Sequence, residues 1–267
     1  MPEYTTWMFY SLLGLGLAWL CAGVVLLRMQ SALVGRKWLW LSWCVWPLSL
    51  TDEAVALASD SWLSLYGLTD WVPVLLMTLF YRALKPRLIA QVRPVKWVSW
   101  LPVCLCLALQ LPLALSGLPE KQRLLAGGPV GHPLDFWPVY AIALLVCFGV
   151  LVLGLLITET VQNYHKYLYQ RVTCPTDYKI RYVVPAMSSM VAIGGVLTLL
   201  VTAVTFGFLN IMLWQNGVGL IFAIATLSVL YLLIIPQRTS PCPIDYAQVD
   251  EQHAEQILMQ ETVNKSR

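Results

Sequence analysis

The sequence predicts an all-helical membrane protein, a bundle of seven transmembrane helices with its N-terminus outside and its C-terminus in the cytoplasm. The first observation behind this prediction is composition. Of the 267 residues, 58% are hydrophobic and only 12% are charged. A soluble domain carries about a quarter of its residues as Asp, Glu, Lys or Arg. We therefore expect the solvent of this chain to be lipid.

The second observation is the length of the apolar stretches. A bilayer core about 30 Å thick needs roughly 20 apolar residues per helix, and a helix satisfies its own backbone groups. The predicted spans are 7–27, 38–58, 61–81, 97–116, 136–158, 184–206 and 212–235. They make residues 1–235 one transmembrane domain, followed by a cytoplasmic tail, 236–267, in which 245–263 is expected to form a short helix.

The third observation is the placement of positive charge. Fifteen of the 17 Lys and Arg residues fall after spans 1, 3, 5 and 7, and only Lys121 and Arg123 fall on the other side. Cytoplasmic loops carry an excess of Lys and Arg, so this alternation gives the orientation. The basic residues assigned to the cytoplasm are Arg28, Arg36, Lys37, Arg82, Lys85, Arg87, Arg93, Lys96, Lys166, Arg171, Lys179, Arg181, Arg238, Lys265 and Arg267.

The first span is expected to stay in the protein as an anchor. Met1-Pro2-Glu3 offers no basic region, and the apolar run is too long for a cleavable signal peptide. Gly14, Ala18 and Ala22 form a stripe of small residues in it. Such a stripe suits close helix contact, either with a neighbouring span, which we favour, or across a homodimer.

The segment after span 5 is predicted to continue that helix into the cytoplasm. Residues 158–172 contain few helix breakers, and Pro175 ends the pattern. This extension is either a solvated helix or a surface on which a partner protein docks.

Acidic residues mark the only candidate site. Asp52 and Glu53 lie in span 2 and Asp70 in span 3, and both helices need these residues to cross the membrane. All three are expected in the outer half, with Asp60 in the turn between the helices. Gln110 of span 4 and Asn216 of span 7 add polar groups on that side.

A carboxylate at membrane depth costs several kcal/mol unless it faces a cavity or a partner. No Lys or Arg lies in any predicted span, which leaves protonation, water or a ligand cation to stabilise the acids. Two readings remain open. One is an externally open polar pocket that binds a ligand through Asp52, Glu53, Asp70, Gln110 and Asn216. The other is that the helices end early and the acids lie at the interface.

Enzyme chemistry has no support in the sequence, and neither a cofactor nor a metal is predicted. His132, His165 and His253 fall in loops or the tail, away from the spans where intramembrane haem would bind. No nucleophile elbow, zinc-protease motif or phosphate loop occurs. A retinal protein needs a lysine in its last span, and residues 212–235 contain none.

Four short stretches resemble the N-terminal membrane-sensor region of bacterial AraC-type transcriptional regulators. They are SLTDEAVALASDSW (49–62), LMTLFYRALKP (76–86), HPLDFWP (132–138) and ETVQNYHKYLYQRV (159–172). The resemblance covers roughly residues 7–235 and implies a sensor whose ligand region is external. Those regulators continue into a helix-turn-helix domain, whereas this sequence stops at Arg267, so direct binding of nucleic acid is not expected.

The sequence therefore leads us to expect a non-catalytic protein of the bacterial inner membrane that detects an external signal. We expect it to relay that signal to a protein partner through its cytoplasmic loops and tail. Two other classes stay open: a small transporter or channel subunit for a cation or polar metabolite, and a structural subunit of an envelope or secretion complex.

Overall fold

The computed structural model describes residues 2–28, 35–57, 60–89, 98–127, 129–172, 174–211 and 214–235. Within these ranges the regular structure is helical and contains no strand. The tail 236–267, including the short helix predicted at 245–263, lies outside the described residues. The α-helices are α1 (Pro2–Arg28), α2 (Arg36–Val45), α3 (Thr51–Leu57), α4 (Val72–Leu88), α5 (Leu101–Ala114), α6 (Leu118–Gly127), α7 (Trp137–Arg171), α8 (Val183–Thr205) and α9 (Trp214–Ile234).

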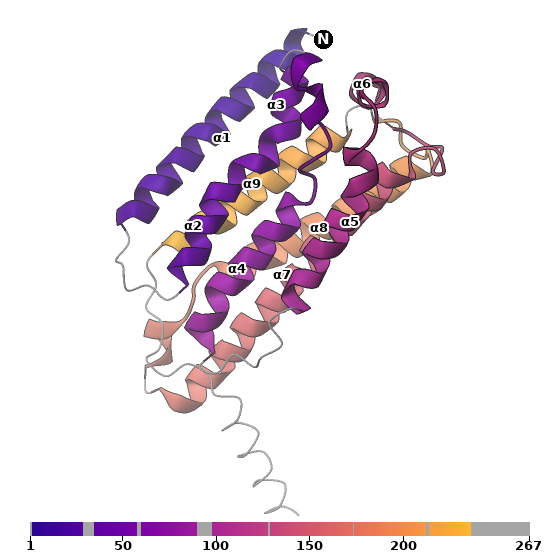
Figure 1. Ribbon diagram of the computed structural model, residues 1–267. Coiled ribbons are helices and arrows are strands. Elements are labelled where there is room, and N and C mark those ends of the chain that lie inside the picture. Colours follow the sequence, from indigo (N-terminus) through magenta and orange to yellow (C-terminus); the bar gives the residue numbers. More distant parts are fainter. Residues whose placement is uncertain are drawn as a thin grey trace, which may run out of the picture.

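The long helices run side by side along one axis of the molecule (Figure 1). The short helix α6 is turned away from that axis, at 103° to α5. It lies at the end of the bundle that also holds α3 and the N-terminus (Figure 1), which we call the α6 end. The bundle therefore has one long, regular body and one more irregular end.

The second predicted span, 38–58, is present as three consecutive pieces. α2 is followed by the 3₁₀-helix η1 (Trp46–Leu50), and α3 follows directly. Pro47 stands at the start of η1. Because proline has no backbone N–H and its ring displaces the carbonyl four residues earlier, the α-helix tightens there. Trp46 fixes the break to the bundle, since its indole N–H donates to the Ala223 carbonyl of α9 at 3.1 Å.

The third predicted span, 61–81, is wrong in its first half. Residues Asp60–Leu65 form the 3₁₀-helix η2, turns follow, and α4 begins only at Val72 and continues to Leu88. Gly67 interrupts the helix with a φ of 71°, a left-handed conformation that glycine adopts readily. Pro73 then stands in the first turn of α4, where proline is tolerated. Asp70 therefore lies in a turn and not within a helix.

Among the described residues, four helices are long and apolar enough to cross a membrane. They are Thr6–Arg28, Trp137–Tyr169, Val183–Thr205 and Trp214–Ile234, and the bent pair α5–α6 makes a fifth if it is one span. Several such helices are expected of a multi-pass membrane protein.

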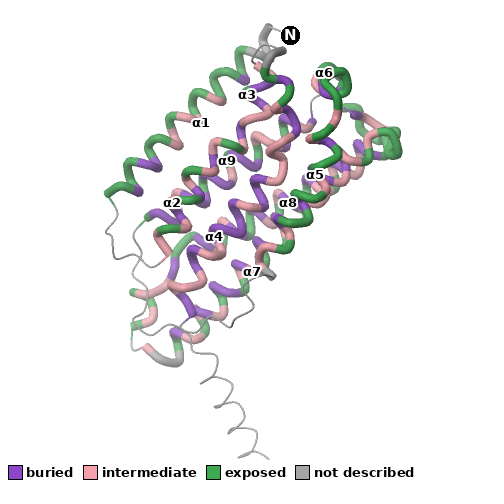
Figure 2. Tube along the Cα trace, in the orientation of Figure 1, coloured by how far each residue is buried: buried purple, intermediate pink, exposed green. Residues whose placement is uncertain are grey.

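Many apolar side chains on the outside of the bundle are exposed, several of them on α1, and much of the α1 trace is exposed (Figure 2). Only 17% of the 18-residue apolar stretch of α1 is buried within the bundle. Within its small-residue stripe, Ala22 is fully buried, whereas a Cβ on Gly14 would meet nothing within 4 Å. The stripe thus contacts the bundle along only part of its length.

The helical continuation predicted after span 5 is confirmed, whereas its location in the cytoplasm stays a prediction. α7 runs without a break to Arg171, a length of 35 residues. At 1.5 Å per residue this helix is about 50 Å long, well beyond the roughly 30 Å of a hydrocarbon core. Its last part packs against the 3₁₀-helix η4 (Pro175–Tyr178).

Candidate functional site

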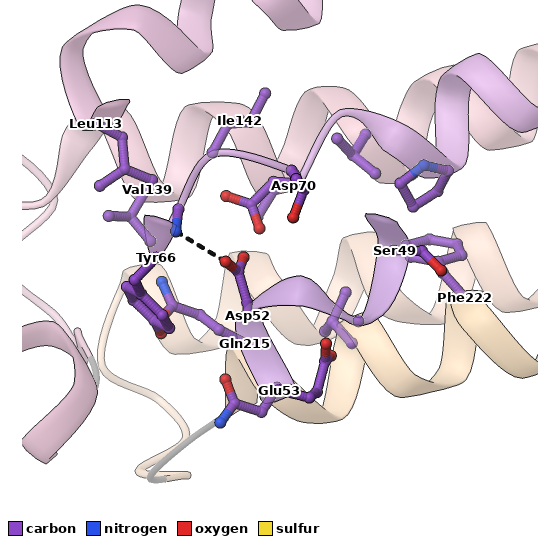
Figure 3. A pocket seen from close by; sticks show the side chains of 18 of the residues that line it. Ser49, Asp52, Glu53, Tyr66, Asp70, Leu113, Val139, Ile142, Gln215 and Phe222 are labelled. Carbon is purple, nitrogen blue, oxygen red and sulfur yellow. Dashed lines mark hydrogen bonds between the residues drawn. The ribbon is translucent and has the colours of Figure 1, made fainter. Parts of the chain in front are cut away.

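A cavity of about 60 Å³ lies among α3, the turn before α4, and the first turns of α7 and α9. Figure 3 shows side chains from these elements converging on it. Four of the five predicted site residues are close together here: Asp52, Glu53, Asp70 and Asn216 line the cavity. The fifth, Gln110, is outside the cavity lining and donates a hydrogen bond to Asp70.

Asp52 and Asp70 face each other across the cavity (Figure 3). Asp52 Oδ1 accepts a hydrogen bond from the Gly67 N–H at 2.9 Å. Asp70 Oδ2 accepts one from the Gln110 amide at 3.0 Å, and the same amide also donates to the Gly67 carbonyl. Both polar backbone groups of Gly67 are therefore bonded to side chains of the site. Two carboxyl groups this close repel each other unless a proton or a cation stabilises them.

Gly67 is required at this position for two reasons. Its positive φ disfavours any residue with a Cβ, and a Cβ there would lie 2.9 Å from the Leu113 side chain. The turn can thus pass close to α5, which brings Gln110 within reach of Asp70. Sequence reasoning did not select Gly67, although a glycine between two apolar segments is a recognised turn signal.

Glu53 is the most deeply buried acid of the site, with 1% of its surface exposed. Its Oε2 atom has no hydrogen-bond partner within the described part of the chain. The carboxyl group lies against Gly219 of α9, and a Cβ on that glycine would collide with Oε1. A larger residue at 219 would therefore displace the Glu53 carboxyl group.

α9 contributes two polar side chains from its first turn. Asn216 is 3% exposed, and its Nδ2 atom lacks a hydrogen-bond partner within the described residues. Gln215 accepts a hydrogen bond from the Tyr66 hydroxyl at 3.2 Å. Asn216 thus places an unused donor in the same cavity as the unused acceptor of Glu53.

Lys121 adds a buried cation near the acids, which the sequence did not place there. Predicted in an external loop, it is instead 2% exposed on α6, and its ammonium group donates to the Ser64 carbonyl at 2.8 Å. Burial lowers the pKa of Lys121, and the negative charge of Asp52 raises it. The position of Lys121 beside the site could not be predicted from the sequence, because it depends on the sharp bend between α5 and α6.

The remaining wall of the cavity is apolar. Ile142 and Val146 of α7 and Phe222 of α9 line it, and Leu124 of α6 closes it from the α6 end. Such a mixture of apolar walls and a few convergent polar groups is typical of a small-molecule site. Among the described residues, no group of three or more His, Cys, Asp or Glu is placed to hold a metal ion. The arrangement suits the binding of a small molecule.

Comparison with models of protein families, with curated proteins and with solved structures finds no match to this chain.

Proposed function

We propose that the chain is a seven-pass protein of the bacterial inner membrane that binds an external signal at this cavity and relays it inward without catalysis. Single continuous helices account for four passes. The other three would be α2–η1–α3, the segment from η2 through α4, and η3 (Val98–Trp100) with α5. In this reading the interruptions in spans 2 and 3 are what bring the acids to the cavity.

The charge pattern supports the orientation. Arg28 ends α1, Arg36 begins α2, and Lys85 and Arg87 lie in the last turn of α4. These ends lie away from the α6 end (Figure 1). By the positive-inside rule they would be cytoplasmic, which puts the cavity on the external side.

The observation that carries the proposal is the Glu53 carboxyl group, 1% exposed and with Oε2 unpartnered in the described structure. A buried carboxylate of this kind is strongly unfavourable unless it takes up a proton or a partner is bound. Ionisable groups at membrane depth usually mark a functional site. Glu53 also lines the same cavity as the acidic pair Asp52 and Asp70.

α7 is the element best suited to carry a signal inward. Near the start of this helix, Val139, Ile142 and Val146 line the cavity. The helix ends at Arg171, beyond the predicted membrane span 136–158. A ligand shifts an equilibrium only if it binds two states unequally. We infer that ligand contact favours one position of α7, and that its cytoplasmic part presents this change to a partner protein. The resemblance to AraC-type sensor regions agrees with such a role.

A variant comparison tests the proposal without knowledge of the signal. Transcript profiles of the source cell would be recorded over a range of growth conditions for wild type, a deletion, and Asp52→Asn with Asp70→Asn. We expect the double variant to reproduce the changes of the deletion. The control is Asp135→Asn, since Asp135 is exposed. The proposal is contradicted if the deletion changes the transcript profile under some condition and the double variant keeps the wild-type profile under that condition.

The second candidate is a transporter, favoured by the facing pair Asp52 and Asp70 between helices. Acidic pairs of this kind carry protons or cations in pumps. Measurement of proton or cation flux across the membrane of proteoliposomes that contain the protein separates the two functions. A sensor shows no flux above that of empty vesicles, whereas a transporter shows flux that Asp52→Asn abolishes.

A further inference from the structure

Two unpartnered polar atoms in the cavity define the kind of molecule that fits it. Glu53 Oε2 accepts hydrogen bonds and Asn216 Nδ2 donates them, and neither has a partner in the described residues. Their side chains are 1% and 3% exposed. A buried polar atom without a hydrogen-bond partner destabilises the folded protein. An occupant that donates to one atom and accepts from the other satisfies both.

The charge of the cavity selects a cation. Asp52, Glu53 and Asp70 line it, and Lys121 on α6 is the ammonium group whose charge interacts with Asp52. Three carboxyl groups against one ammonium group leave a net negative charge when all are ionised. A ligand ammonium group stabilises such a cluster through charge-assisted hydrogen bonds.

The donor set favours an organic cation over a bare metal ion. Hard metal cations need about six or more oxygen ligands in most sites, and no described group of three or more acidic, His or Cys side chains is placed to supply them. Ile142, Val146 and Phe222 form an apolar wall opposite the acids. A short carbon chain can contact that wall while its nitrogen faces the carboxyl groups.

The volume limits the size of the ligand. The cavity measures about 60 Å³, and one buried water needs roughly 10–15 Å³ of such space. The space therefore equals that of about four to six water-sized groups, enough for a molecule of a few non-hydrogen atoms.

We propose that the cavity binds a small primary ammonium ion that carries a hydroxyl or carbonyl oxygen a few bonds from its nitrogen. The ammonium group donates to Glu53 and the oxygen accepts from Asn216, while the pair Asp52 and Asp70 adds negative charge to the same cavity. This inference rests on the proposed function, because the same cavity is taken as the signal site. It goes further by naming the class of ligand.

Calorimetric titration of the full chain in lipid nanodiscs tests the ligand class. The probe is 2-aminoethanol hydrochloride at neutral pH, compared with ethylammonium, tetramethylammonium and sodium chlorides at equal ionic strength. We expect saturable binding of 2-aminoethanol and about tenfold weaker binding of ethylammonium, which lacks the oxygen. Tetramethylammonium, which has no N–H donor, and sodium should give no saturable binding.

Variants identify the contacts. Glu53→Gln keeps the shape of the side chain and should weaken 2-aminoethanol binding by about tenfold or more. Asn216→Ala should remove the preference for 2-aminoethanol over ethylammonium. Gly219→Ala should weaken binding of both because it displaces the Glu53 carboxyl group. Glu120→Gln is the matched control, since Glu120 is exposed on α6 and should bind as wild type.

Absence of 2-aminoethanol binding, or equal binding of sodium or tetramethylammonium, would overturn the ligand class. If transcripts still respond to Asp52→Asn with Asp70→Asn in that case, the sensor function stands with a different ligand. If 2-aminoethanol binds as expected while the transcripts ignore the variants, the binding site stands and the sensor function fails.

Discussion

Trp19 of α1 and Trp43 of α2 each donate an indole N–H to the backbone carbonyl of the other, at 2.8 and 3.0 Å. Their rings are stacked, with centroids 4.7 Å apart and an interplanar angle of 10°. Gly23 makes room for this pair, because a Cβ there would lie 2.7 Å from the Trp43 ring. The pair joins a helix that is otherwise mostly exposed to the rest of the bundle.

The first prediction concerns this pair. Trp43→Phe keeps an aromatic ring but removes one N–H donor and exposes the Trp19 carbonyl. Hydrogen bonds between membrane helices contribute about 0.6 kcal/mol on average and up to about 1.7, so we expect a loss of roughly 1 kcal/mol in the free energy of unfolding. Denaturation in mixed micelles measures it. In a double-mutant cycle, Trp19→Phe with Trp43→Phe should cost less than the sum of the single variants. Additive losses would show that the two bonds act independently.

The positions of the helices were predictable because apolar length determines them. α7, α8 and α9 begin and end within two residues of their predicted spans, apart from the extension of α7. The four side chains that meet in the cavity were also predictable as a group: Asp52, Glu53, Asp70 and Asn216. In a chain that crosses a membrane back and forth, the end of each even-numbered span lies on the same side as the start of the next span.

What the sequence could not predict depends on contacts between segments. The turn that holds Asp70 requires Gly67 to approach Leu113, and periodicity in 61–81 gives no sign of it. The burial of Lys121 requires the bend between α5 and α6. A lysine after an apolar span is ordinarily solvated, so its role at the site appears only once the helices are packed.

The second prediction concerns Gly67. Gly67→Ala forces a Cβ into a left-handed conformation, which costs about 1–2 kcal/mol, and overpacks Leu113, which costs about 1–3 kcal/mol. We expect the free energy of unfolding to fall by roughly 2–5 kcal/mol. Adding Leu113→Ala should relieve the overlap but not the backbone strain. The control is Gly195→Ala in α8, where a Cβ would meet nothing within 4 Å. An equal loss in the control would contradict the stated cause.

The third prediction concerns Lys121. Lys121→Met removes a positive charge close to Asp52 and leaves the Ser64 carbonyl without its donor. We expect stability to fall by about 1 kcal/mol and the affinity for 2-aminoethanol to rise a few-fold, because less positive charge remains near the carboxyl groups. Titration of the variant measures this. Arg123→Met changes the net charge equally, but Arg123 is exposed and stacks over Phe136, so its affinity should match wild type.

The fourth prediction concerns the C-terminal part of α7. His165 Nε2 accepts a hydrogen bond from the Ile180 N–H at 3.2 Å, which requires the ring nitrogen to be unprotonated. His165 lies beyond the predicted span 136–158, on the extension of the helix. Burial and then the positive charge of Lys179 lower the pKa of His165 below its ordinary value near 6.5.

Because the folded pKa lies below the unfolded one, the neutral ring stabilises this contact above about pH 6.5, and the stabilisation is lost as the pH falls through the folded pKa. Hydrogen–deuterium exchange of the Ile180 amide, corrected for its intrinsic pH dependence, should therefore accelerate in mildly acidic buffer. His165→Gln supplies an acceptor that does not titrate and should keep Ile180 protected over the same range. If wild type and the glutamine variant exchange with the same pH dependence, protonation of His165 does not control the contact between α7 and the segment that follows it.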